Sequence, residues 1–301
     1  MREAGCTATQ EIAFTLSNGL EYLTQAIDSG LDIDDVAPRM SFFFGCHNDF
    51  FEEVGKFRAA RQLWHDLVTE RFQPNNPKSS MLRFHTQTAG VTLTAQQPLN
   101  NAVRVSYQAL SAVLGGTQSL HTNSYDEAIG LPTEESALLA LRTQQVLAEE
   151  TNVPNSVDPL AGSYLVEELT SKLYQNSRYL IEEIDKMGGA MQCVIAGYQQ
   201  RHIHEAAWNQ LQSIEDGTTT VIGVNKFVEG ETTDIVGQIQ NPTIAQLQLN
   251  QIEQIIEERD STKADQCKRS IEDAITDGSN LMEPLIECVA KKFYGTCLLY
   301  T

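Results

Sequence analysis

The stretch MLRFHTQTAGVTLTAQQPLNNAVRVSYQALSAVLGGTQSLHTNSYDEAIGL, residues 81–131, decides the fold of this 301-residue chain. It predicts a strand over 81–90, a helix over 100–114 and a second strand that opens at Thr117. A barrel or a doubly wound sheet places its chemistry at the C-terminal end of parallel strands. Polar residues gather there in both predicted strands: His85, Gln87, His121, Asn123, Asp126 and Glu127. The stretch therefore predicts an α/β fold with a functional site.

The segments before and after this stretch continue the alternation. Apolar spacing predicts helices over 9–29, 48–72 and 133–151, and the continuously apolar run at 38–45 predicts a buried strand. Up to Thr151 the order indicates a parallel sheet with helices outside it. Three strands alone would leave unpaired backbone groups along both edges of that sheet. We therefore expect the sheet to belong to a larger one that begins upstream.

Beyond Thr151 the predicted elements are mostly helical. A long loop with two prolines covers 152–162. A short strand is predicted over 221–225, and 232–242 reads as irregular. The predicted helices cover 163–187, 190–214, 244–259, 263–276 and 280–293. Trp64 and Trp208 are predicted to lie in the core.

Bulk composition excludes several classes of protein. The net charge of −19 argues against a general nucleic-acid or anionic-membrane binder. No run reaches the roughly 18 apolar residues of a membrane helix, and the N-terminus has no apolar signal segment. The six cysteines are scattered without a Cys-x-x-Cys pair. We therefore expect reduced thiols and a cytoplasmic location. We also expect no metal site, because the side chains of His202 and His204, two residues apart on a predicted helix, point in different directions.

Several stretches, in collinear order up to about Met282, resemble the large catalytic subunit of the adenosylcobalamin-dependent acyl-CoA mutases, the family that includes methylmalonyl-CoA mutase. The resemblance is carried by EAG (3–5), APRMSFFFG (37–45), HTQTAG (85–90), GTQSLHTN (116–123) and GVNK (223–226). Because the stretches follow one another along nearly the whole chain, the resemblance is far more specific than any one motif.

The resemblance implies that residues 1–151 are the C-terminal part of a (β/α)8 barrel and that 152–301 form a mostly helical region after the barrel. The family's Tyr-His pair, its carboxylate-binding Arg and its Asp-x-His-x-x-Gly motif do not occur here. We therefore expect an N-terminal half of the barrel and a cobalamin-binding domain or subunit as partners, in a dimer or heteromer. Residues 294–301 do not match the family pattern and are expected to be non-native.

The implied activity is the radical isomerisation of an acyl-CoA with adenosylcobalamin, with interconversion of methylmalonyl-CoA and succinyl-CoA as the leading expectation. Isobutyryl-CoA and 2-hydroxyisobutyryl-CoA mutases are alternatives that this sequence does not separate. Two further alternatives come from other classes: a truncated, non-catalytic interaction fragment and a stand-alone CoA-binding module.

The resemblance also implies site residues, each with a plainer alternative. Arg39 and Ser41 would contact the CoA part of the substrate, although a surface salt bridge would also explain the arginine. His85 and Gln87, on one side of a strand, would be catalytic, whereas a buried hydrogen-bonded pair is the alternative. Helix capping is the alternative for Asp126 and Glu127. The implied cofactor contacts are Glu3, Gln87, Glu127, Ala128 and Leu131.

Overall fold

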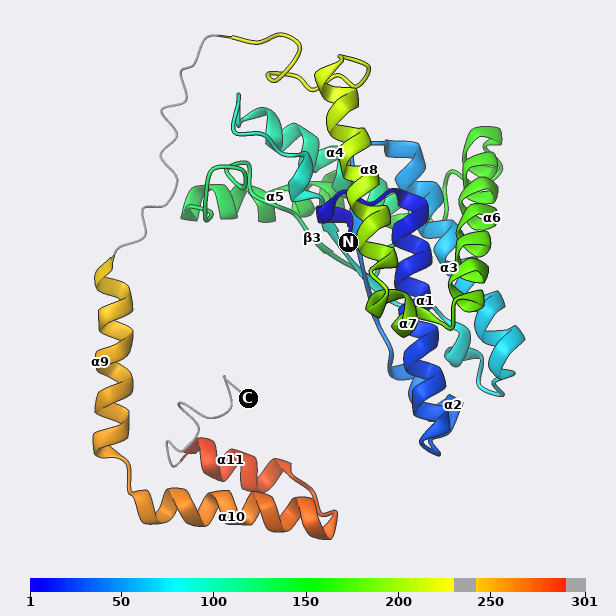
Figure 1. Cartoon of the computed structure of the whole chain (residues 1–301). Helices are drawn as coiled ribbons and strands as arrows, with labels where there is room; N and C mark the ends of the chain where they lie inside the picture. Colours follow the sequence, from blue (N-terminus) through cyan, green and yellow to red (C-terminus); the bar gives the residue numbers. More distant parts are fainter. Residues whose placement is uncertain (230–241, 291–301) are drawn as a thin grey trace. The chain divides into compact units, whose positions relative to one another are not determined.

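The structure of the chain is a computed structural model that describes residues 1–229 and 242–290 (Figure 1). The chain divides into two compact units, Met1–Gln238 and Ile239–Thr301, and each is described by itself. Among the described residues, no helix is long and apolar enough to cross a membrane. All the predicted site residues lie in the first unit.

A three-stranded parallel sheet forms the centre of the first unit. Helix α3 (Phe50–Phe72) connects its first two strands and helix α4 (Asn100–Leu114) connects the second and third. The prediction of about three parallel strands with intervening helices is confirmed. In spatial order the strands are β1 (Phe42–Cys46), β2 (Phe84–Thr88) and β3 (Ser119–His121).

The strands are shorter than the stretches predicted for them. Ahead of β1, Pro38 lies in the 3₁₀ helix η2 (Ala37–Arg39), because proline fixes φ and has no N–H for the strand ladder. Ahead of β2, the 3₁₀ helix η3 (Pro77–Ser80) ends just before Met81. The bounds predicted for α4 agree with the structure.

One face of the sheet is the core of the unit. Phe44, Cys46, Phe84 and Thr86 are fully or almost fully buried on it. Phe57 of α3 stacks on Phe84 with ring centroids 5.2 Å apart. Burying a large aromatic side chain contributes on the order of 2–3 kcal/mol, so this face holds the sheet against its helices.

The opposite face, called here the open face, is formed by Phe43, His85, Gln87, Ser119 and His121. Register partners across the strands place Phe43, His85 and Ser119 in one row and Gln87 beside His121 in the next. Phe43 is 55% exposed although it stands in an apolar run. Side chains alternate between the two faces of a strand, which is why His85 and Gln87 share the open face as predicted.

Further helices complete the first unit, and two of them, α1 (Ala8–Asp28) and α6 (Tyr164–Lys186), pack on α3. Thr7 begins α1 with a capping box, in which its hydroxyl accepts from the Gln10 N–H, a contribution of about 1 kcal/mol. α6 runs along α3, the most extensive helix pair of the unit. The helices are α1 (Ala8–Asp28), α2 (Ile33–Val36), α5 (Glu134–Glu150), α6 (Tyr164–Lys186), α7 (Ala190–Ile195) and α8 (Tyr198–Glu215). Short 3₁₀ helices are η1 (Arg2–Ala4), η4 (Gly90–Thr92) and η5 (Val153–Asn155).

Three local predictions are wrong. The helix predicted over 190–214 divides into α7 and α8, because Gly197 takes a left-handed φ of +68° between them. The strand predicted over 221–225 does not form; a turn at Gly223 leaves a single bridge between Ile222 and Lys226. Trp208 is 60% exposed on α8, whereas Trp64 is buried as predicted.

The second unit is helical. Buried Ala264, Cys267, Ala274 and Cys288 lie between two of its helices. The prediction for 294–301, and that for 232–241, fall outside the described residues. The predicted end of the barrel part at Thr151 lies inside the first compact unit and stays a prediction. The helices of this unit are α9 (Pro242–Glu258), α10 (Ser261–Asp277) and α11 (Met282–Ala290).

Candidate functional site

His85 lies at the centre of the open face. Its Nδ1 is 2.7 Å from Ser119 Oγ on β3. Its ring centroid is 5.3 Å from that of Phe43 on β1. Burial and the nearby His121 lower the pKa of His85, so the ring is neutral at neutral pH. Among the described residues Nε2 has no hydrogen-bond partner, so it is available to a ligand on this face.

Gln87 lies two residues further along β2 on the same face. Its side-chain amide lies 3.1 Å from that of Asn123, and the backbone N–H of Asn123 donates to Thr88 Oγ1 at 2.9 Å. These bonds hold the chain that leaves β3 against the C-terminal end of β2. Gly90 follows at once, and a Cβ there would lie 2.8 Å from Asn123 Nδ2. A larger residue at position 90 would displace the amide.

Two carboxylates flank the same end of β2. Glu3 accepts from the N–H groups of Gly90 and Val91 at 2.8 and 2.7 Å, at the start of η4. Glu127 is exposed, and its Oε1 would lie 3.5 Å from a Cβ on Gly90. Burial and, next, the charge of Glu3 raise the pKa of Glu127. The structure therefore brings together three predicted cofactor contacts, Glu3, Gln87 and Glu127.

Glu3→Gln is expected to lower the pKa of Glu127, because the change removes the charge that raises it and leaves the burial in place. A ¹³C NMR titration of the side-chain carboxyls measures this directly. Glu134→Gln, at the exposed start of α5, is the matched control and should leave the Glu127 titration where it is. If Glu127 titrates identically in the wild type and in Glu3→Gln, the two carboxylates do not interact.

The other two predicted cofactor contacts, Ala128 and Leu131, are exposed in the loop between β3 and α5. Leu131 is 55% exposed, an apolar side chain facing solvent next to Glu127. Beneath this loop, buried Asp126 accepts from the Thr133 N–H at 3.2 Å, and Thr133 caps α5. The helix-capping alternative therefore accounts for Asp126, whereas Glu127 remains free to face a ligand.

Arg39 and Ser41 lie at the other end of the sheet, just ahead of β1, and both are exposed. Arg39 has no ion pair among the described residues, so the salt-bridge alternative finds no partner there. Beside it, Arg83 donates to the carbonyls of Pro38 and Met40. From Ser41 to Gly45 a strand rises about 13 Å, so a ligand that touches both ends of the open face is extended.

A buried charged quartet, formed by Arg2, Glu11, Glu53 and Lys56, lies behind the C-terminal end of β1. Lys56 is completely buried; its Nζ lies 2.7 Å from Glu11 Oε2 and is also paired with Glu53. Arg2 donates to Glu53 Oε1 at 2.8 Å. The quartet also binds Gly45, whose N–H donates to Glu11 at 2.7 Å and whose carbonyl accepts from Lys56 at 2.6 Å. These contacts fix the strand end next to Gln87.

Sequence patterns alone do not predict this quartet. A signal was present, because Glu53 and Lys56 fall on the apolar stripe of α3 with Phe57, Ala60 and Leu63. Charges on a buried stripe need partners. Those partners come from Arg2 and Glu11, more than 40 residues away, and no spacing rule points to them.

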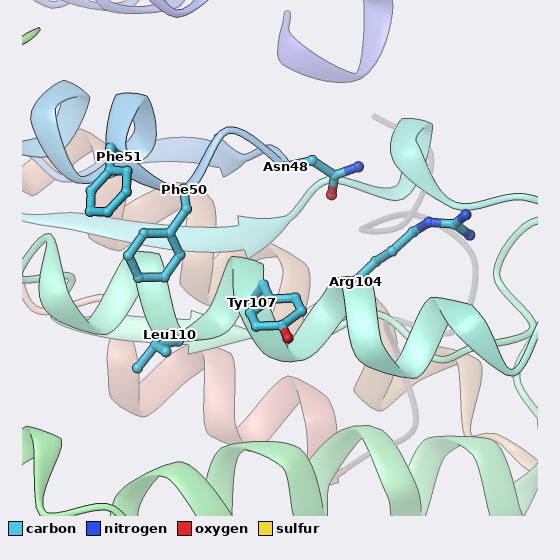
Figure 2. Close-up of a pocket in the computed structure, with 6 residues that line it drawn as sticks. All are labelled: Asn48, Phe50, Phe51, Arg104, Tyr107 and Leu110. Atoms are coloured by element: carbon cyan, nitrogen blue, oxygen red, sulfur yellow. The ribbon is translucent and has the colours of Figure 1, made fainter. Parts of the chain in front are cut away.

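A separate pocket of about 510 Å³ lies between the start of α3 and the outer side of α4 (Figure 2). None of the predicted site residues lines it. Its arginine and its asparagine are already engaged: Arg104 donates to Thr94, Asn101 and the Ile222 carbonyl, and Asn48 accepts from Gln108. The chemistry therefore favours the open face over this pocket. The lining residues are Asn48, Phe50, Phe51, Arg104, Tyr107 and Leu110.

The residues at the C-terminal end of β2 suit a broad ligand with amide groups on its rim, as a corrin has. The exposed Glu127 carboxylate accepts hydrogen bonds, and exposed Leu131 offers an apolar contact. Within the described parts of the chain, no three His, Cys, Asp or Glu side chains gather to bind a metal.

Comparisons with known proteins show the family of the chain. The family model described as methylmalonyl-CoA mutase matches residues 1–295. A methylmalonyl-CoA mutase of Rhizobium meliloti is 46% identical over 289 residues, which are 95% of this chain and 40% of that protein. The probable mitochondrial methylmalonyl-CoA mutase of Caenorhabditis elegans is 43% identical over 95% of this chain and 39% of that protein. The mitochondrial methylmalonyl-CoA mutase of Mus musculus is 43% identical over 92% of this chain and 37% of that protein. The chain thus spans about two fifths of the relatives' length.

Proposed function

The chain belongs to the methylmalonyl-CoA mutase family, and from that premise we propose that it is part of the catalytic subunit of an adenosylcobalamin-dependent acyl-CoA mutase. The leading reaction is the interconversion of methylmalonyl-CoA and succinyl-CoA. The observation that carries the proposal is the open face. It holds a neutral histidine with a free Nε2 and the glutamine of an amide pair, and an exposed carboxylate lies beyond it at the C-terminal end of β2.

In this proposal the three strands are the last strands of a (β/α)8 barrel, and the open face is turned toward the barrel interior. The remaining strands and a cobalamin-binding domain or subunit are partners, in a dimer or heteromer. The relatives' greater length supports such partners. Cytoplasmic location stays a prediction, since relatives named as mitochondrial match alongside bacterial ones.

Different residues along the open face would contact the CoA part, the acyl group and the cofactor. Arg39 and Ser41, at the start of β1, hold the CoA part, and arginine suits its phosphates. His85 donates from Nε2 to the thioester carbonyl, which orients and polarises the acyl group. At the far end of β2, Gln87, Glu3 and Glu127 meet the cofactor's amide groups, and Ala128 and Leu131 pack on its ring. Bound there, adenosylcobalamin supplies the radical chemistry of the rearrangement.

The deciding experiment is turnover on a panel of acyl-CoA substrates. The chain is combined with adenosylcobalamin, a cobalamin-binding part and the N-terminal barrel part of a relative. The panel contains methylmalonyl-CoA, isobutyryl-CoA and 2-hydroxyisobutyryl-CoA. Turnover of methylmalonyl-CoA alone supports the proposal, and turnover of another substrate replaces it with that alternative. A folded complex without any turnover favours the non-catalytic fragment.

In an active complex, His85→Ala is expected to lower kcat about tenfold, because the acyl carbonyl loses one neutral hydrogen bond worth about 1.4 kcal/mol. Steady-state assays at saturating substrate measure the effect. His65→Ala is the matched control, since His65 is exposed on α3 and contacts Asp66. Equal rates for His85→Ala and wild type would remove His85 from the reaction.

A further inference from the structure

Ser119 is the residue that touches His85 and to which no role has been given. The two are register partners on β3 and β2, so the backbone ladder places their side chains next to each other on the open face. Ser119 Oγ lies 2.7 Å from His85 Nδ1. On the other side, the Phe43 ring lies at 45° to the imidazole with centroids 5.3 Å apart. One row of the sheet thus holds the imidazole from both sides.

A neutral imidazole has one N–H donor and one acceptor nitrogen, so the hydrogen bond to Ser119 fits two arrangements. If Nδ1 carries the proton, it donates to Ser119, and both the serine hydrogen and the Nε2 lone pair are left over. If the serine donates to Nδ1, the Nε2–H and the lone pairs of the serine oxygen are left over. Among the described residues neither Ser119 Oγ nor Nε2 has another partner, so only the second arrangement presents the open face with an imidazole N–H, the donor that the thioester carbonyl of the proposed function requires.

We propose that Ser119 is a positioning residue that fixes the Nε2–H tautomer of His85 by donating to Nδ1. The partner of a histidine's first ring nitrogen decides which nitrogen carries the proton. The Nε2–H then stands on the open face as a donor of fixed direction. A ligand oxygen that accepts from it is a carbonyl or carboxylate oxygen. Under the proposed function, on which this consequence rests, that oxygen is the thioester carbonyl.

A nucleophilic serine is the other reading of a serine–histidine pair. In such a pair a third polar group holds the histidine that acts as the base. Here the other side of the His85 ring is occupied by the Phe43 ring, and no carboxylate among the described residues bonds to the imidazole. The pair is therefore built to orient the histidine and not to activate the serine.

The test is ¹⁵N NMR of the full chain labelled at its six histidines, at neutral pH. The signal of His85 is assigned from its loss in His85→Gln. We expect a protonated Nε2 and an unprotonated, hydrogen-bonded Nδ1. In Ser119→Ala the two shifts should move toward each other as the tautomers mix, and Ser119→Thr, which keeps a hydroxyl and suits a strand, should restore them. Ser106→Ala, whose hydroxyl donates to the Ala102 carbonyl in α4, is the control.

Two results would overturn the proposal: a proton on Nδ1 in the wild type, or His85 shifts that do not change in Ser119→Ala. The wild-type measurement keeps the test decisive even where the alanine variant does not fold. In the reconstituted mutase, Ser119→Ala should lower kcat about three- to tenfold and Ser119→Thr should recover it, the scale of one neutral hydrogen bond. An Nε2–H tautomer in a complex without turnover would end the proposed function and leave the role of Ser119 intact.

Discussion

Replacing Lys56 by methionine is expected to destabilise the chain by about 3–5 kcal/mol, because it leaves buried carboxylates without their cation. Lys56 and Glu53 are both fully buried, and Glu11 is 3% exposed. Methionine has nearly the length of lysine, so the loss comes from the charge and not from a cavity. Arg2 remains on Glu53 at 2.8 Å, but Glu11 and the Gly45 carbonyl lose their donor. Urea unfolding followed by circular dichroism measures the change.

Two variants separate the charge effect from general damage. Glu11→Gln with Lys56→Met removes the unpaired carboxylate and keeps an amide oxygen for the Gly45 N–H, so it should be more stable than Lys56→Met alone. Lys172→Met breaks the exposed pair with Glu168 on α6 and should leave the unfolding midpoint unchanged. If Lys56→Met is as stable as Lys172→Met, the quartet does not contribute to stability.

The difference between wild type and Lys56→Met should also shrink as the pH falls below about 4.3, the unfolded pKa of a glutamate. Burial alone would raise the pKa of Glu53, but Lys56 and Arg2 outweigh it and hold that pKa below its usual value. A carboxyl with a lowered pKa in the folded state contributes stability that is full above its unfolded pKa of about 4.3, and acid removes it. In the variant, Glu53 takes up a proton more easily, so the variant loses less stability on acidification.

Gly5→Ala is expected to cost about 2–4 kcal/mol, through backbone strain and a clash. Gly5 follows η1 with a φ of +97°. A Cβ there would lie 2.5 Å from Ala207 Cβ and 3.0 Å from Ala207 Cα on α8. The glycine therefore allows α8 to pack directly on the segment that carries Arg2 and Glu3. The measurement is the free energy of unfolding by urea.

Gly217→Ala is the control for the strain alone, since Gly217 has a φ of +80° and nothing lies within 4 Å of its added Cβ. Gly5→Ala should therefore be the more damaging of the two. Ala207→Gly should recover part of the Gly5→Ala loss, and a double-mutant cycle isolates that part from the helix cost of the new glycine. Purely additive single and double variants would show that α8 does not contact Gly5.

The sequence predicted the elements whose signals are local. α4 was predicted with its correct bounds because apolar periodicity and the pair Gly115-Gly116 mark it. Strand alternation placed His85 and Gln87 on one face. The partnership of Ser119 with His85 depends on the register between two strands that are more than 30 residues apart, and one strand alone does not fix a register.

The wrong predictions of burial arise because tertiary structure, and not the apolar character of a residue, decides which side chains are covered. Trp208 is apolar and its sequence pattern predicts a core position, but no described element of the first unit covers its side of α8. Phe43 stands between two less exposed phenylalanines and yet faces the open side, because strand alternation outweighs the apolar run. The role of each predicted cofactor and substrate contact stays a prediction, since the geometry alone fixes only which residues lie together.

The bonds that Glu11 and Lys56 make to Gly45 limit how far any neighbouring strand can extend alongside β1. The Phe42 N–H donates to the Arg83 carbonyl and the Cys46 carbonyl accepts from Ala89, both at 2.8 Å, so the even-numbered residues turn toward β2. Phe43 and Gly45 turn their backbone groups the other way. Those of Gly45 are already occupied. A strand added on that side can pair at Phe43 but must end before Gly45, so the buried charges also set where the next strand stops pairing.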